Sequence, residues 1–187
     1  LCPPGIKLFR SPRSYNSQIG VALSLLMIEG DEQLAIIEAG ISEPGEMERL
    51  EAMIRPDIGI FTNLGDAHQE HFTSLEQKLS EKLILFRHAR TILYNAGDQW
   101  VTDQIACTYA DHKLCAVDPN HYDLSTLPYR DQASLENAAK AIALYDILGY
   151  NLKSILATLP SLQSVAMRME LKEGINGCKL INDSYNS

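Results

Sequence analysis

Short apolar runs, each followed at once by small or polar residues, recur along the chain and predict the strands of a buried sheet. These runs cover residues 34–37, 58–62, 91–94, 114–117 and 179–181. The residues that follow them are typical of the carboxyl ends of parallel strands that are covered on both faces. The pattern therefore favours a mainly parallel sheet whose polar strand ends meet at one edge.

Helical patterns occupy the intervals between these runs. The predicted helices cover residues 18–28, 47–54, 74–87, 98–106, 134–148 and 152–159. The first carries one apolar stripe, as in an amphipathic helix, made of Ile19, Ala22, Leu23, Leu26 and Met27. Strands that alternate with helices indicate an α/β domain with a mainly parallel sheet flanked by helices. For the turn-rich residues 121–131 we consider a short antiparallel piece, and we find no linker that would divide residues 1–187 into two domains.

Composition and charge narrow the function classes. The chain of 187 residues has 24 acidic and 16 basic side chains, a net charge of −8, which argues against a general binder of nucleic-acid backbones. The net charge does not exclude a local pocket for phosphate.

The four cysteines include no C-x-x-C pair, which argues against a zinc ribbon and fits a reducing cytosol. We find no signal peptide and no apolar run as long as a membrane span, so we expect a cytoplasmic protein with no membrane span.

Polar residues that follow the predicted strands mark the candidate site. In open parallel sheets, ligands bind outside the carboxyl ends of the strands, and this position holds Glu38, Asn63, Asp66, His68, Asn95, Asp118 and Asp183. Taken alone, each signal is weak. A glutamate such as Glu38 is more often a helix cap or an ion-pair partner than a metal ligand. A lone His68 is more often a surface or loop histidine, and a lone Lys82 is most often a solvated helix lysine. Asn16 and Asn63 are ordinary turn residues.

Four local motifs, taken together, are far more specific. They are Ser-Pro-Arg-Ser-Tyr-Asn-Ser-Gln-Ile-Gly at 11–20, Glu-Ala-Gly-Ile-Ser-Glu-Pro-Gly-Glu at 38–46, Thr-Asn-Leu-Gly-Asp-Ala-His at 62–68 with Lys82 on the next helix, and Arg-Met-Glu at 168–170 with Asn-Asp-Ser-Tyr-Asn at 182–186. In this order the chain resembles the central, ATP-binding domain of the Mur ligase family, the enzymes that build the peptide of bacterial cell-wall precursors. The resemblance is strongest to the branch that adds D-alanyl-D-alanine to UDP-N-acetylmuramoyl-tripeptide, some members of which are fused to an alanine racemase.

The resemblance implies a P-loop-NTPase-like fold and an ATP-dependent ligase. ATP would phosphorylate the substrate carboxylate to an acyl phosphate, and the amine of D-alanyl-D-alanine would displace phosphate to form an amide. Glu38 and His68 would be ligands of Mg²⁺, joined by Lys82 as a carbamylated lysine, and these three would form the catalytic group. The remaining implied roles are adenine contact by Asn137, phosphate contact by Arg168, ribose contact by Asp183, and binding of the UDP-sugar substrate by Ser14, Asn16 and Ser17.

The chain departs from the family pattern in three places. Relatives read Lys-Gly-Glu where this chain reads Lys-Leu-Ile at 82–84. Lys78 lies one turn earlier on the same helical face, and spacing alone does not separate it from Lys82. The resemblance over residues 72–86 selects Lys82, and we expect Lys78 to be solvated. Ala133 and Ser134 replace a His-Asn pair. The chain also has no G-x-x-x-x-G-K-[ST] loop. We therefore expect a central-domain fragment that lacks the phosphate loop, the UDP-binding domain and the carboxyl-terminal domain, and that binds ATP weakly and is inactive by itself.

Two other functions stay open. One is a noncatalytic binding or structural module that kept the fold and lost the phosphate loop. The other is a different ligase of the superfamily, such as a folylpolyglutamate synthase. The retained set of polar residues favours the cell-wall ligase, since a module has no need of it. We further predict that Glu38, His68 and Lys82, although they lie on three different elements, converge at the carboxyl edge of the sheet.

Overall fold

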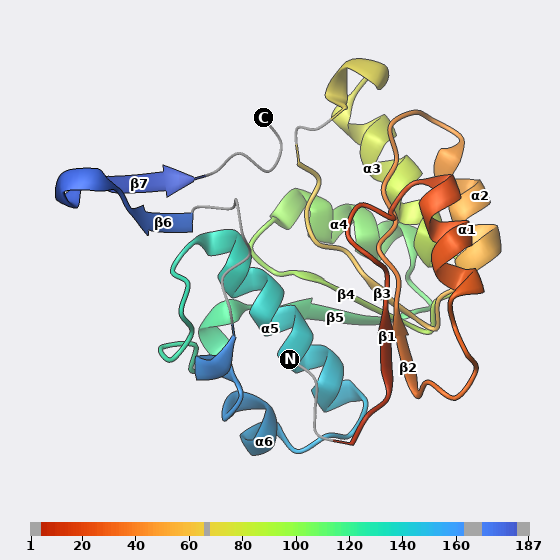
Figure 1. Cartoon of the computed structure of the whole chain (residues 1–187). Helices are drawn as coiled ribbons and strands as arrows, with labels where there is room; N and C mark the ends of the chain where they lie inside the picture. The colour runs from red at the N-terminus through yellow and green to blue at the C-terminus, as the bar shows by residue number, and fades with distance from the viewer. Residues whose placement is uncertain (1–4, 66–67, 163–169, 183–187) are drawn as a thin grey trace.

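A computed structural model describes residues 5–65, 68–162 and 170–182 of the chain. Strand β1 (Leu8–Arg10) pairs in parallel with β2 (Leu34–Ile36), while β3 (Ile58–Ile60), β4 (Thr91–Asn95) and β5 (Lys113–Val117) form a second parallel sheet in the order β3-β4-β5. Helices surround these strands (Figure 1). They are α1 (Gln18–Leu26), α2 (Glu46–Ile54), α3 (Leu75–Leu83), α4 (Gln99–Thr108), α5 (Gln132–Ile147) and α6 (Leu152–Leu156). The predicted α/β architecture with parallel strands and flanking helices is confirmed.

The side chains of β4 divide the core between two faces. Successive residues of a strand point to opposite sides. Leu93 belongs to one buried cluster with Ile142 of α5, whereas Ile92 belongs to another with Leu79 of α3 and Ile105 of α4. Figure 1 shows α5 on the near side of the strands and α4 behind them. The sheet is therefore covered on both faces, which is why its strands read as continuous apolar runs.

Side chains at the starts of the helices explain where several helices begin. Ser74 accepts a hydrogen bond from the N–H of Gln77, Asp98 from Val101 and Asp131 from Ser134. Helix α2 is different, because its N-cap is Gly45, at φ +84°. The carboxylate of Glu81, on α3, instead accepts the N–H of Gly45 at 2.6 Å and that of Met47 at 3.2 Å. This contact joins the start of α2 to α3.

The predicted apolar stripe of α1 is wrong about which face is buried. Ile19 and Leu26 are 75% and 82% exposed, and the buried residues of this helix are Gly20, Val21 and Ser24. Backbone contact decides the orientation, since a Cβ atom placed on Gly20 would lie 2.6 Å from the Cα of Tyr15. Only a glycine permits this approach. The larger apolar side chains consequently face outward.

The run at 179–181 does not join the parallel sheet. Strand β7 (Lys179–Asn182) pairs antiparallel with β6 (Glu170–Glu173), and Leu180 and Ile181 are exposed. The hairpin projects from the rest of the molecule in Figure 1. Asn176 and Gly177, both at positive φ, turn the chain back between the two strands. An Asn-Gly pair is a strong hairpin signal, so the sequence itself carries this turn.

Two segments between the main elements differ from the predicted structure. Residues 121–131 form a 3₁₀ end and turns and contain no strand. The helix predicted over 74–87 stops at Leu83 and continues as a 3₁₀ turn over Ile84–Phe86. In the described ranges, no helix is both long enough and apolar enough to cross a membrane.

Candidate functional site

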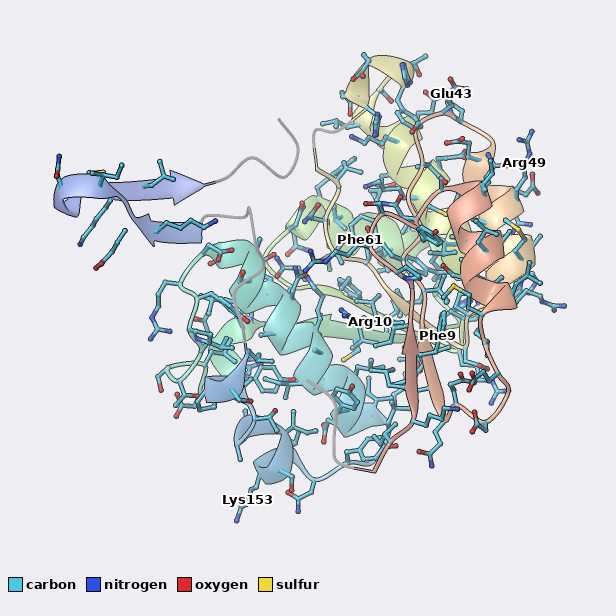
Figure 2. All side chains as sticks on the ribbon, viewed as in Figure 1. Phe9, Arg10, Glu43, Arg49, Phe61 and Lys153 are labelled. Atoms are coloured by element: carbon cyan, nitrogen blue, oxygen red, sulfur yellow. The ribbon has the colours of Figure 1, made fainter. Side chains whose placement is uncertain are left out.

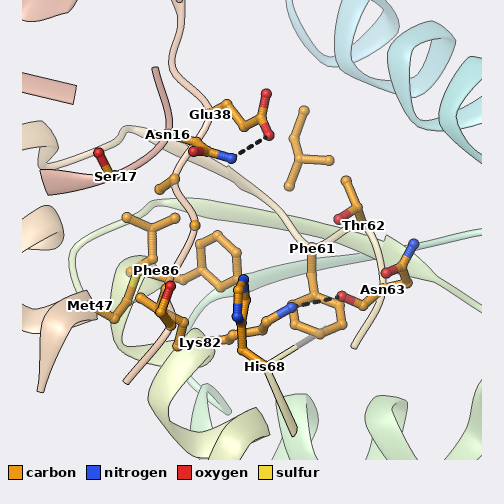
Figure 3. A pocket seen from close by; sticks show the side chains of 16 residues that line it. Asn16, Ser17, Glu38, Met47, Phe61, Thr62, Asn63, His68, Lys82 and Phe86 are labelled. Carbon is orange, nitrogen blue, oxygen red and sulfur yellow. Dashed lines mark hydrogen bonds between the residues drawn. The ribbon is translucent and has the colours of Figure 1, made fainter. Parts of the chain in front are cut away.

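A polar cavity of about 360 Å³, here called the central pocket, opens at the carboxyl ends of β2 and β3 (Figure 3). The predicted site residues that line it are Asn16, Ser17, Glu38, His68 and Lys82; Thr62 and Asn63 contribute as well. Glu38 follows β2, His68 follows β3, and Lys82 extends from α3. The structure thus brings the three predicted metal ligands to one cavity from three elements.

Glu38 is oriented by the loop that precedes α1. The amide Nδ2 of Asn16 donates to Oε1 of Glu38 at 3.1 Å, and the backbone N–H of Gly40 donates to the carbonyl oxygen of Asn16 at 2.8 Å. Ser17 caps α1 by accepting the N–H of Gly20. Ser14 is exposed at φ +65° and does not line the central pocket.

Three lysines, here called the lysine cluster, hold the backbone that leaves β3. Their ammonium groups donate to carbonyl oxygens of residues 62–65. Lys78 reaches Gly65 at 2.7 Å, Lys82 reaches Leu64 at 2.8 Å, and Lys140 reaches Thr62 at 3.1 Å. Figure 3 shows Lys82 extending past His68 toward Asn63, whose carbonyl oxygen lies 3.4 Å from its Nζ.

Burial shapes the electrostatics of the lysine cluster. Lys78 and Lys140 are only 1% and 2% exposed, so the expectation that Lys78 is solvated is wrong. Burial, and next the charge of Lys78, lower the pKa of Lys82 to about 8. Burial also lowers the pKa of Lys140, although Glu136 acts in the opposite direction. Lys82 is the member of the lysine cluster that lines the central pocket, which Glu38 also lines.

Two members of the lysine cluster, Lys78 and Lys140, are not among the predicted site residues. Lys78 was assigned to solvent because a lysine on an amphipathic helix is usually solvated. Lys140 gave a usable signal, since it lies among Ala138, Ala139 and Ile142 on the apolar face of α5. A lysine at such a position needs a buried partner, and Thr62 supplies it.

A second cavity, of about 410 Å³, lies at the carboxyl ends of β4 and β5 beside the start of α5. Its lining includes Asn95, Asp98, Asp118, Asn120 and Glu136. Asn137, the predicted adenine contact, is an exposed residue of α5 next to Glu136 and lines neither cavity. The other two predicted nucleotide contacts, Arg168 and Asp183, fall outside the described residues.

Known proteins resemble this chain in sequence and in fold. The family "Mur ligase middle domain" matches residues 3–144. The UDP-N-acetylmuramoyl-tripeptide–D-alanyl-D-alanine ligase of Borreliella burgdorferi is 27% identical over 96% of this chain, and that of Bacillus subtilis is 24% identical over 97%. This chain spans 44% of the length of each of these two relatives.

Solved structures agree on the fold. MurF from Acinetobacter baumannii superposes with a TM-score of 0.85 at 20% identity, covering 98% of this chain and 46% of that one. MurF from Thermotoga maritima, solved in complex with ADP, superposes with a TM-score of 0.78 at 19% identity, covering 98% of this chain and 48% of that one. With its parallel strands, its polar strand ends and the family match over most of its length, the chain belongs to the Mur ligase family, as a middle domain.

Proposed function

We propose that this chain is the nucleotide-handling middle domain of an ATP-dependent ligase that adds D-alanyl-D-alanine to UDP-N-acetylmuramoyl-tripeptide. One observation carries the proposal: Glu38, His68 and Lys82 line a single pocket at the carboxyl ends of parallel strands. The names of the relatives from Borreliella burgdorferi and Bacillus subtilis specify the same ligation. Because ATP and a UDP-linked precursor are the substrates, we assign the reaction to the cytoplasm.

The proposed reaction balances in two steps. A carboxylate oxygen of the tripeptide attacks the γ-phosphorus of ATP, the bond to the β,γ-bridging oxygen breaks, and ADP leaves. The amine of D-alanyl-D-alanine then attacks the acyl carbon, phosphate leaves with the bonding electrons, and the amine loses a proton. Phosphoryl transfer depends chiefly on positioning and on charge neutralisation.

The donor set of the central pocket fits Mg²⁺ if Lys82 carries a carbamate. Mg²⁺ is a hard ion that prefers oxygen ligands. Glu38 offers a carboxylate, of which Oε1 already accepts from Asn16, and His68 offers an imidazole nitrogen. As an ammonium group Lys82 would repel the ion, whereas its carbamate would present two anionic oxygens. When bound, the ion would offset negative charge on the transferred phosphoryl group.

The remaining roles follow the family resemblance. Asn16 and Ser17 line the pocket and are proposed, with Ser14, to bind the UDP-sugar substrate. Asn137, Arg168 and Asp183 are proposed to contact the adenine, phosphates and ribose of ATP. The fusion to an alanine racemase stays a prediction.

The test uses the intact protein that contains this domain. We expect phosphate release from ATP to require both UDP-N-acetylmuramoyl-tripeptide and D-alanyl-D-alanine. Lys82→Ala should lower the rate by at least about 100-fold, the usual cost of losing one preorganised electrostatic group, whereas Lys113→Ala, an exposed position at the start of β5, should leave it unchanged. Phosphate release that is independent of either substrate, or full activity of Lys82→Ala, would contradict the proposal.

A further inference from the structure

The loop after β3 carries a second group of metal-ligating side chains. Ligand atoms of His68, Glu70 and His71 lie within 4.8 Å of one another, and all three residues are exposed. The two imidazole rings are stacked, with centroids 6.3 Å apart and planes 19° apart. Glu70 and His71 belong to the 3₁₀ turn Gln69–His71 and line neither of the two cavities.

A hydrogen bond to the backbone engages one ring nitrogen of His71. Its Nδ1 lies 2.9 Å from the carbonyl oxygen of Ser42. A carbonyl oxygen only accepts, so Nδ1 carries a proton, and Nε2 is the ring nitrogen that can serve as a metal ligand. Ser42 is itself fixed, because its backbone N–H donates to Oε2 of Glu46 at 2.6 Å. Metal-ligating histidines characteristically donate their other ring N–H to such a carbonyl.

The donor set indicates which ion would bind. Two imidazoles and one carboxylate with a place left for water suit a borderline divalent ion such as Zn²⁺, whereas Mg²⁺ favours oxygen ligands. Tetrahedral ligand atoms at about 2.1 Å from zinc lie about 3.4 Å apart. Rotation of the exposed side chains of His68 and Glu70 can close the remaining difference. We propose that His68, Glu70 and His71 form a binding site for a borderline transition-metal ion, represented by Zn²⁺.

This site goes beyond the proposed ligase function and shares only His68 with the central pocket. A metal ion bound by the three side chains would hold the His68 imidazole beside Glu70 and His71. Binding can be measured on the chain without ATP or any cell-wall precursor. Failure of the zinc proposal would therefore leave the ligase proposal standing, and failure of the ligase proposal would leave the zinc site standing.

The experiment titrates the protein with Zn²⁺ in competition with a chromophoric chelator. We expect one ion per chain with micromolar affinity, at least a tenfold loss of affinity in His71→Ala and a clear loss in Glu70→Gln. The matched control is His121→Ala, an exposed histidine of the 3₁₀ turn Pro119–His121, which should bind Zn²⁺ like the unaltered chain.

Substitution with Co²⁺ identifies the ligands independently. A site of two imidazoles and one carboxylate gives visible d–d absorption without the thiolate charge-transfer band that cysteine ligation would add. The proposal is overturned if no stoichiometric Zn²⁺ binds, if His71→Ala binds as tightly as the unaltered chain, or if the thiolate band appears. Circular dichroism of each variant checks that these surface substitutions leave the fold intact.

Discussion

Lys78 buries its whole side chain so that its ammonium group can reach the carbonyl oxygen of Gly65 at 2.7 Å. We expect Lys78→Ala to lower the free energy of unfolding by about 1–3 kcal/mol, because buried methylene groups and one hydrogen bond are lost together. Urea unfolding gives the value. Lys153→Ala, at the surface of α6 (Figure 2), is the matched control and should change stability by less than about 0.5 kcal/mol. Equal effects of the two substitutions would show that Lys78 has no structural role.

Gly20 allows a second test at the residue scale. Alanine is ordinarily better than glycine inside a helix, by about 1 kcal/mol. Here a Cβ atom would lie 2.6 Å from the Cα of Tyr15, so we expect Gly20→Ala to destabilise the fold by about 1–3 kcal/mol despite its helix propensity. Thermal unfolding measures the difference. Leu26→Ala, on the exposed face of the same helix, should be nearly neutral, and a stabilised Gly20→Ala would refute the close contact.

Some residues of the candidate site can be predicted from the sequence. The buried lysines beside the site are harder to predict, because their role depends on the fold. Glu38, His68 and Lys82 are predicted through the family resemblance, because each signal is weak when taken alone, and the structure places all three in the central pocket. Lys140 carries a local signal, its place on the apolar face of α5, whereas the burial of Lys78 depends on the path of residues 62–65 beside α3. No local pattern encodes that path.

At the scale of elements, Glu81 connects two helices by capping one from the other. We expect Glu81→Ala to reduce stability by about 1–2 kcal/mol, since the N–H groups of Gly45 and Met47 lose a charged acceptor. Chemical unfolding followed by far-ultraviolet circular dichroism measures the loss. The control is Glu48→Ala, which removes an exposed ion pair with Arg87 at 3.5 Å and should cost less than about 1 kcal/mol. A loss no larger than that of the control would argue against the cap.

Helices and strands can be predicted from the sequence where the pattern of apolar residues is clear and the residues at the ends of the element agree with it. The structure places β3 to β5 and α3 to α5 close to their expected positions. The strands are marked by apolar runs and the helices by a helical spacing of apolar residues, and capping or turn residues mark their ends. Strand β1, with the sequence Leu-Phe-Arg, lacks the continuous apolar run that marks the other parallel strands. The apolar side chains of α1 follow a helical period, which predicts that their side of the helix is buried. In the structure that side is exposed, because close contact between Gly20 and the backbone of Tyr15 turns the opposite side of the helix inward.

Across the whole molecule, the free energy of local unfolding should differ between strands. Strand β4 is the central strand of its sheet and its first four residues are buried, whereas β6 and β7 pair only with each other and their described side chains are exposed. We expect amide hydrogens of β4 to exchange most slowly and those of the β6–β7 hairpin to exchange fastest among the strands. Hydrogen–deuterium exchange with mass spectrometry reads both regions in one experiment. Protection of the hairpin equal to that of β4 would mean that it packs against something else.

The contact between Gly20 and Tyr15 also constrains how the sequence can change over evolutionary time. A clash between two side chains can be relieved by shrinking the partner, but the atom that a side chain at position 20 would meet belongs to the backbone. No substitution at position 15 can move it out of the way. Glycine should therefore persist at this position even in homologues that have replaced the pocket residues, and its persistence would carry no information about which substrate they use.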